Sequence, residues 1–367
     1  MDTTELIGTS GRSPGSSSGA ITTHRGFRVG GVSVSAESQG NDHIVLDAQL
    51  EPFGMECNAA DVTIRVEWAT DLRTETQKRV FDSGSIWRLY DSTAGFQFDF
   101  RAPAFGDQPY KRLLIDSRFR CGTLQLNRVC RGILPNIGGT FGYPLDELLI
   151  MHRLTQEKAI ELHGTGIVRD NGDANLFVGH SGAGKSTTTR LWTSVEEVEV
   201  LSDDRIIVRR DETATADLGA DDCANEVGIL RLRDRSASPN GHFAKDDKRI
   251  SHFAQDDKQI PRFARNDKRM RMYGTPWHGE AMFASPNSAP LSRIFVLEHG
   301  HGNVITPLTP SQAVAELFAR SFVPFHRHEY VDSALVFLEE LANSVPVYRY
   351  SFEPDQRAVE KIRKFRD

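Results

Sequence analysis

Short stretches that alternate apolar and polar residues dominate the first part of the chain. The clearest are residues 63–68 and the stretch in which single polar residues separate Phe96, Phe98 and Phe100. A period of two is typical of strands with one buried and one solvated face. Residues 27–141 therefore predict a β-rich N-terminal domain, an antiparallel meander whose phenylalanines face the core. Its other predicted strands are residues 43–46, 86–90 and 112–115.

After Pro144 the pattern changes to apolar residues at helical intervals, which alternate with short apolar runs. Leu145, Leu148 and Leu149 open the first predicted helix. Helices that alternate with buried strands are typical of an α/β domain, which we expect over residues 142–367. The predicted strands are residues 175–178, 198–201, 205–210, 294–298 and 345–350, and the later predicted helices begin at residues 186, 311, 331 and 358.

Two segments have the composition of flexible chain. Residues 1–26 are rich in Ser, Gly and Pro, so we expect a disordered tail. Residues 242–271 repeat a ten-residue unit that is too short for a helical solenoid and carries one Phe per copy. We therefore expect a mobile insertion at about residues 233–271. The alternative interpretation is a basic arm with spaced aromatic residues that contacts RNA or an acidic partner.

The α/β part contains a complete phosphate-loop motif, Gly179-His180-Ser181-Gly182-Ala183-Gly184-Lys185-Ser186, followed by Thr187. Its glycines permit backbone conformations that direct several N–H groups at one anion. The loop lies between an apolar run and a helix-like segment, so the positive end of a helix dipole faces the same anion. We expect Gly179 to Thr187 to bind ATP, with Lys185 on the β- and γ-phosphates and Ser186 on Mg²⁺.

A pair of carboxylates, Asp203 and Asp204, follows the predicted strand at residues 198–201. Oxygen ligands at a strand end beside a phosphate loop suit Mg²⁺, and a second acid can accept a proton. We expect Asp204 to hold the metal and Asp203 to act as the base, although the two residues can exchange these roles. The competing interpretation is an acidic turn that closes the strand.

The loop together with Leu-Ser-Asp-Asp-Arg at residues 201–205 resembles the superfamily of HPr kinase/phosphorylase and phosphoenolpyruvate carboxykinase. Residues 162–168 and 273–279 are similar to the stand-alone HPr kinase-like serine kinases of bacteria, and the resemblance covers roughly residues 140–367. It implies an α/β P-loop kinase domain that transfers the γ-phosphate of ATP to a serine on a protein or peptide. The preceding β-rich domain is outside the resemblance.

The resemblance also implies particular site residues. A histidine at the position of His163 lies near the transferred phosphate in the HPr kinase group, which gives the catalytic set Lys185, Asp203 and His163. His278 and Glu280, in the segment Tyr-Gly-Thr-Pro-Trp-His-Gly-Glu, are candidate substrate contacts. For each, a structural role is the alternative, as is a salt bridge for Arg320, which is long enough to reach a phosphate.

Two other functions compete with a serine kinase. A regulatory or scaffold protein would bind the nucleotide and transfer nothing. A carboxykinase would need a basic pocket for a carboxylate substrate and is usually a larger enzyme. The chain also lacks the Glu-Ile-Arg-Gly-Leu-Gly segment of HPr kinase itself, which leaves the acceptor open.

Composition and cysteine spacing limit the function classes and the cellular compartment that we expect. The 367 residues carry a net charge of −6, and 26% of them are charged, which argues against a dedicated nucleic-acid binder. The four cysteines form no Cys-x-x-Cys pair, so we expect buried or partly buried thiols in a reducing, cytoplasmic setting. No apolar run is long enough to span a bilayer. The expected partner is a serine-bearing protein or peptide, and a homo-oligomer remains open.

Overall fold

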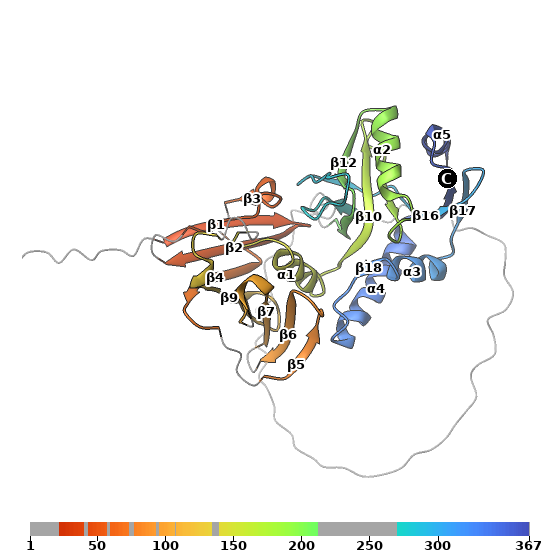
Figure 1. The fold of residues 1–367 in the computed structure, drawn as a ribbon. Coiled ribbons are helices and arrows are strands. Elements are labelled where there is room, and N and C mark those ends of the chain that lie inside the picture. Colours follow the sequence, from red (N-terminus) through yellow and green to blue (C-terminus); the bar gives the residue numbers. More distant parts are fainter. Residues whose placement is uncertain are drawn as a thin grey trace, which may run out of the picture.

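The structure is a computed structural model of the chain. It describes residues 22–39, 43–56, 59–72, 77–92, 95–106, 108–133, 139–211 and 270–366. These residues form two β-sheets joined by the helix α1 (Leu145–Leu154), with further helices around the second sheet (Figure 1). The first sheet is drawn in red to orange and the second in green to blue (Figure 1).

The first sheet contains nine strands in the order β3-β1-β2-β4-β9-β8-β7-β6-β5. Its first four strands are β1 (Thr22–Val29), β2 (Val32–Gln39), β3 (Gly54–Met55) and β4 (Val62–Ala69). The others are β5 (Arg79–Asp82), β6 (Trp87–Ser92), β7 (Gly95–Phe100), β8 (Lys111–Asp116) and β9 (Cys121–Asn127). Short 3₁₀ turns lie at Glu51–Phe53, Pro103–Phe105 and Arg128–Cys130.

Several sequence predictions for this sheet are wrong in detail. The predicted tail extends too far, because β1 begins at Thr22 and pairs with β2 along its whole length; residues 1–21 lie outside the described residues. The meander is not antiparallel throughout, since β4 pairs in parallel with both β2 and β9. Residues 43–46 form no strand, and Leu46 makes only an isolated bridge to Phe141. Alternation predicts a strand but not its partner.

The buried side of the first sheet packs against α1. Phe96, Phe98 and Phe100 are each at most 1% exposed, as their spacing predicts. The same apolar cluster includes Leu145 and Leu149 of α1, and it extends to side chains from beyond the predicted domain boundary. The cluster therefore crosses the boundary predicted at residues 141 and 142, and α1 packs within it.

The second sheet contains ten strands, with β15-β14-β13-β10-β11-β16-β19-β17 in order and β12 and β18 also paired with β10. Its strands are β10 (Ala159–Arg169), β11 (Ala174–Val178), β12 (Val198–Ser202), β13 (Arg205–Arg210) and β14 (Met270–Tyr273). They continue with β15 (Ser288–Pro290), β16 (Arg293–His299), β17 (Val304–Pro307), β18 (Ser321–Phe322) and β19 (Val347–Phe352).

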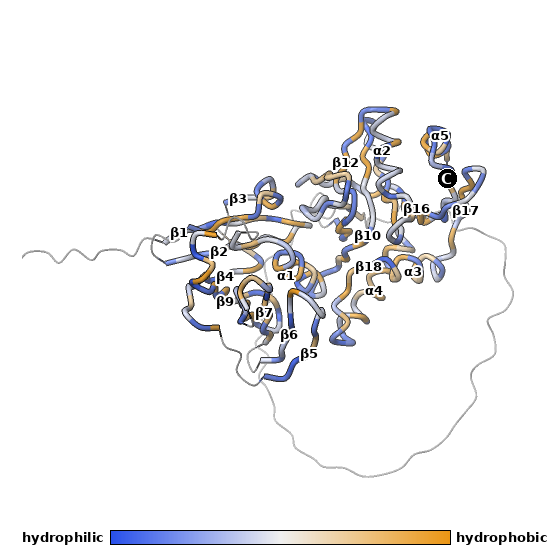
Figure 2. The backbone as a smooth tube through the Cα atoms, viewed as in Figure 1, coloured by the Kyte–Doolittle hydropathy of each residue, from blue (hydrophilic) through white to orange (hydrophobic). Residues whose placement is uncertain are grey.

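The helices of this part bury one face each. They are α2 (Lys185–Val195), α3 (Pro310–Phe318), α4 (His328–Ser344) and α5 (Gln356–Lys364). Thr309 caps α3 with a complete capping box, as Thr309 and Gln312 bond each other's backbone N–H groups. Hydrophobic and hydrophilic residues alternate along both the strands and the helices (Figure 2). The predicted helices in this region are confirmed.

The strand β10 organises the second sheet. One part of it pairs with β13 and β18, and its later part pairs with β12 and β11. The hairpin turn between β12 and β13 therefore lies beside the middle of β10, at His163 and Gly164. Gly164 N–H donates to the backbone oxygen of Asp204 over 2.9 Å. This arrangement brings the acidic pair to the strand that precedes the phosphate loop.

The last residue of β13 pairs with the first residue of β14. Arg210 lies opposite Met270, so the chain leaves and re-enters the sheet at neighbouring positions. Most of the predicted insertion lies outside the described residues, but its predicted end at residue 271 is wrong, because Met270 and Arg271 belong to β14. Among the described helices, none combines the length and the apolar character needed to cross a membrane.

Candidate functional site

The predicted strand, loop and helix around the phosphate-loop motif are confirmed: β11 ends at Val178, and α2 begins at Lys185. Gly182 and Gly184 adopt φ angles of 80° and 102°, which are strained for residues that carry a Cβ. At Gly184 an added Cβ would also lie 2.5 Å from the ring of Phe352. The loop conformation therefore depends on glycine at this position.

The start of α2 offers unpaired donors. Gly179 N–H donates to His163 O over 3.1 Å, and Ala183 N–H donates to His180 O over 3.0 Å. The N–H groups of Gly184, Lys185 and Ser186 donate to no atom of the described residues. Backbone donors at a helix start that lack partners form an anion site together with the helix dipole.

Lys185 is folded back over the loop and is only 7% exposed. Its Nζ donates to the backbone oxygens of Gly179, at 3.1 Å, and His180, at 3.3 Å. Burial lowers the pKa of Lys185, while the negative charge of Asp204 raises it in part. A buried ammonium held only by carbonyl oxygens is poorly compensated, so a phosphate at the loop would stabilise it.

Asp204 forms a pair with His163 beside this lysine. His163 Nε2 lies 2.9 Å from Asp204 Oδ1, and Arg205 Nη1 lies 2.6 Å from Asp204 Oδ2. Burial raises the pKa of the Asp204 carboxyl, but the hydrogen bond from His163 and the charges of Arg205 and Lys185 outweigh it, so the pKa lies below its usual value. Asp204 is therefore an ionised carboxylate that orients His163.

Asp203 occupies a different environment, although it is the neighbouring residue. It is 1% exposed and accepts the backbone N–H groups of Gly279, Ala281 and Phe283 at 2.9, 2.8 and 3.2 Å. Both of its carboxylate oxygens are therefore occupied by the loop over residues 279–283. This geometry favours a structural role for Asp203 over the predicted role as the base, because three backbone donors already engage its buried carboxylate.

Sequence reasoning missed a buried charge cluster behind Asp204. Arg205 Nε lies 2.5 Å from Glu147 Oε1 and 3.4 Å from Glu161 Oε1, and its guanidinium lies 4.7 Å from the ring centroid of Phe322. Burial, and then the charge of Glu147, raise the pKa of Glu161 well above its usual value. The sequence offered one signal for this cluster. Glu161 is an acidic residue in an otherwise apolar strand, two positions before His163, so the two side chains lie on the same face of that strand.

The remaining predicted residues divide into two groups. Arg320 is buried and paired with Glu316 at 2.6 Å, and its charge is the largest cause that lowers the pKa of His180. It thus lies near the loop, although its salt bridge is not on the surface. His180, Ser181 and Glu280 are exposed, Thr187 and His278 are half-buried, and His278 Nδ1 lies 3.1 Å from Gly279 O.

The segment over residues 273–280 is anchored beside the acidic pair. Thr275 Oγ1 donates to Arg205 O over 2.7 Å, and Trp277 Nε1 donates to Asp146 Oδ2 over 2.8 Å. Trp277 is 3% exposed, so it anchors the segment from within the core. A Cβ at Gly279 would lie 3.0 Å from Asp203 Oδ2 and 3.2 Å from Asp204 Cβ, so glycine allows this segment to pack closely against the acidic pair.

The donor set fits a magnesium ion. No group of three or more His, Cys, Asp or Glu residues within the described ranges could hold a metal alone. Mg²⁺ in nucleotide sites needs only one or two protein oxygens, since phosphates and waters supply the rest. The Ser186 hydroxyl bonds no atom of the described residues, and Asp204 is ionised, so both suit this cation.

No protein-family model and no curated protein matches this chain. The evidence for function is therefore the geometry of the phosphate loop and of the Asp204–His163 pair.

The cysteine prediction is wrong for Cys121, which is exposed, whereas Cys130 is buried. The other two cysteines lie outside the described residues.

Proposed function

We propose that this protein is a cytoplasmic, ATP-dependent phosphotransferase with an HPr kinase-like P-loop domain, and that it moves the γ-phosphate of ATP to a serine-type hydroxyl on a protein or peptide. The observation that carries the proposal is one assembly of groups. Three N–H groups at the start of α2, which have no partner among the described residues, adjoin a buried Lys185, and the ionised Asp204 interacts with that lysine and orients His163.

The first task of the site is to hold polyphosphate. The N–H groups of Gly184, Lys185 and Ser186 would donate to phosphate oxygens, and Lys185 would exchange its carbonyl partners for the β- and γ-phosphates. Charge that develops on the transferred group would be compensated by these fixed donors, which need little reorganisation. Ser186 and Asp204 would hold Mg²⁺, which supplies charge neutralisation to the β- and γ-phosphates when bound.

The second task is to accept the proton of the attacking hydroxyl. If Nε2 of His163 carries the proton donated to Asp204 Oδ1, Nδ1 is a neutral acceptor. The hydroxyl proton would move to Nδ1 while the oxygen attacks the γ-phosphorus and the bond from the γ-phosphorus to the bridging oxygen breaks. The carboxylate of Asp204 would stabilise the imidazolium that forms, and ADP would leave.

The test separates binding from transfer. Lys185→Ala should weaken ATP binding at least about tenfold in isothermal titration and abolish transfer, because a charge-assisted contact to the phosphates is lost. Lys361→Ala is the control, since Lys361 is exposed on α5. Transfer would be followed with labelled ATP and a cell lysate, looking for phosphoserine.

Each outcome separates the possible functions. Unchanged binding and transfer in Lys185→Ala would overturn the proposal. ATP binding by the wild-type protein without transfer to any serine-bearing protein would instead favour the nucleotide-binding regulator.

A further inference from the structure

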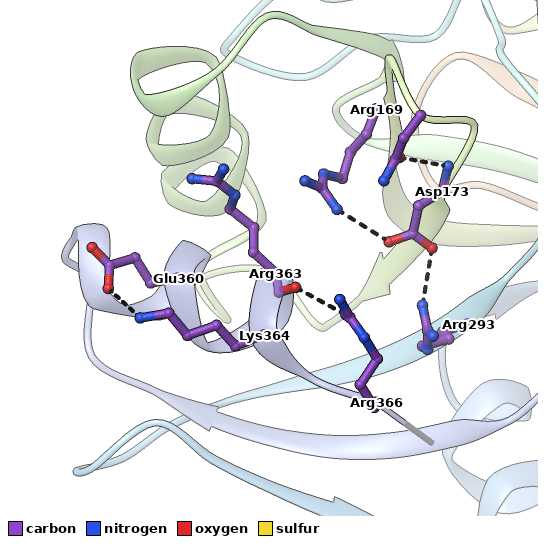
Figure 3. Close-up of a pocket in the computed structure, with 8 residues that line it drawn as sticks. Arg169, Asp173, Arg293, Glu360, Arg363, Lys364 and Arg366 are labelled. Carbon is purple, nitrogen blue, oxygen red and sulfur yellow. Dashed lines mark hydrogen bonds and ion pairs between the residues drawn. The ribbon is translucent and has the colours of Figure 1, made fainter.

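A basic pocket opens far from the phosphate loop. It lies between α5 and the turn that joins β10 to β11, at the first residue of β16, and has a volume of about 620 Å³ (Figure 3). Five of its lining residues are cationic: Arg169, Arg293, Arg363, Lys364 and Arg366. Only Asp173 and Glu360 are acidic, so the pocket carries a surplus of positive charge in a chain whose net charge is −6.

The pairing of these groups leaves positive charge available. Asp173 is shared by Arg293 at 2.9 Å and Arg169 at 3.6 Å, and Glu360 pairs with Lys364 at 3.2 Å. Arg366 donates only to the backbone oxygens of residues 363 and 365, at 3.1 and 3.0 Å. Among the described residues, Arg366 therefore has no carboxylate partner.

Two of the arginines are held in position from behind. Glu196, at the end of α2, accepts Arg169 Nε at 2.6 Å and lies 3.0 Å from Arg363 Nε. The guanidinium of Arg169 also lies 5.7 Å from the ring centroid of Trp192. Guanidinium groups fixed in this way lose little side-chain entropy when they bind an anion.

The pocket and the phosphate loop lie at opposite ends of the same elements. Asp173 precedes β11, whereas the loop follows it, and α2 runs from the loop back to Glu196. The 11 residues of α2 rise by about 16 Å. A ligand in the pocket is thus separate from a nucleotide at the loop.

We propose that this pocket docks an acidic segment of a partner protein, with Asp or Glu side chains against the arginines. Arginine forks match carboxylates in geometry as well as in charge. The volume exceeds that of a single small anion and suits several side chains of an extended segment. No lining residue is aromatic, so a nucleotide base would find no ring to stack on. The proposal is independent of phosphoryl transfer.

The test uses the full-length protein and a fluorescein-labelled peptide of six glutamates, followed by fluorescence anisotropy at low salt without nucleotide. Lys364→Glu and Arg366→Glu should each weaken binding about tenfold, and binding should fall as salt rises. Lys361→Glu is the matched control: it makes the same charge change on α5, the helix that carries Lys364, but outside the pocket, and should change binding less than about twofold.

Both pocket residues are exposed, and thermal unfolding would verify that the variants fold. Equal weakening in all three variants, or in none, would overturn the proposal. Full displacement of the peptide by an equal concentration of inorganic phosphate would also overturn it, since the site would then bind small anions. The proposal would also be overturned if a single-stranded oligonucleotide bound more tightly than the glutamate peptide and if its binding depended on the same two residues. ATP binding measured in parallel keeps this test distinct from that of the phosphate loop.

Discussion

Asp203 and Asp204 are neighbours in the sequence, yet their side chains have different hydrogen-bond partners. Asp203 is enclosed by three N–H groups of the loop over residues 279–283, and Asp204 contacts His163 and Arg205. The difference arises because they occupy successive positions of a tight turn, so their side chains leave the backbone in different directions. One acid therefore fixes a loop, and the other orients His163 and Arg205.

Replacing these two residues should separate stability from activity. Asp203→Asn should lower the free energy of unfolding by about 1–3 kcal/mol, because an amide presents only one acceptor oxygen to the three donors. Asp204→Asn should change stability less and reduce the proposed transfer by about 10²-fold or more, because the orientation of His163 and the proposed metal ligand are lost. Urea denaturation and labelled-ATP assays on both variants measure these effects.

The reverse result would contradict this assignment. If Asp203→Asn were as stable as the wild type but inactive, Asp203 would be the base after all. His163→Asn would provide a third comparison, since it removes the proposed acceptor nitrogen and leaves the contacts of Asp203 in place. Its transfer rate should fall as far as that of Asp204→Asn, with ATP affinity retained.

At the residue scale, the sequence predicts the conformation of the phosphate loop well and the roles of the nearby acidic residues poorly. The loop is a local motif whose function depends on glycine backbone geometry, which residues 179–186 encode by themselves. The role of Asp203 depends on donors more than 70 positions later, and the role of Arg205 depends on Glu147 in α1. Neither long-range contact leaves a periodic signal in the chain.

At the scale of elements, α1 meets the segment that precedes α4 through the buried His152 and the half-buried His326. The ring centroids of His152 and His326 lie 5.2 Å apart, and His152 also stacks on Phe119 at 4.8 Å. Burial, followed by the charge of His326, lowers the pKa of His152 to about 3. Burial, followed by the charge of Arg327, lowers the pKa of His326 to about 4. Both rings are therefore neutral in the folded protein at pH 7.

This contact should make the protein sensitive to acid. Below about pH 6.5 both histidines are protonated in the unfolded chain. In the folded protein His326 stays neutral down to about pH 4 and His152 down to about pH 3. The free energy of unfolding therefore decreases as the pH falls. For His152 the loss at pH 5 is about 2 kcal/mol. In urea denaturation at pH 7.5 and pH 5, His152→Leu should lose about 2 kcal/mol less than the wild type between the two pH values. Equal losses in both proteins would show that His152 does not carry the effect.

Most elements follow from amphipathic patterns, but the pairing of strands does not. The helix over residues 145–154 and the strand β11 lie where periodicity predicts them. In contrast, β4 pairs in parallel with β9, whose first residue comes more than 50 positions later. Alternation specifies which face of a strand is buried and leaves its neighbours open.

At the scale of the whole molecule, the two sheets share one buried layer. The apolar cluster of the first sheet includes Ile207 of β13 and Trp277, in addition to α1. Polar contacts cross the same boundary, since Arg209 Nη1 donates to Gly30 O over 2.8 Å and Trp277 Nε1 donates to Asp146. The sequence does not indicate this junction, because its partners are far apart along the chain.

This shared layer predicts that the part resembling a kinase does not fold alone. A fragment of residues 142–367 would expose Leu145, Leu149 and Ile150 of α1, each at most 1% exposed in the full chain. It should show no cooperative thermal transition, whereas the full chain and a chain that begins at residue 22 should each melt in one step. Differential scanning calorimetry of the three proteins tests this. A fragment with its own sharp transition would show that the layers are separable.

The pairing of Arg210 with Met270 has a practical consequence for cell biology. Opposed residues of an antiparallel pair lie only about 5 Å apart, so a fluorescent protein whose termini are close together can be spliced between them with little strain on the sheet. The resulting fusion would carry its fluorophore beside β13, the strand that begins at Arg205.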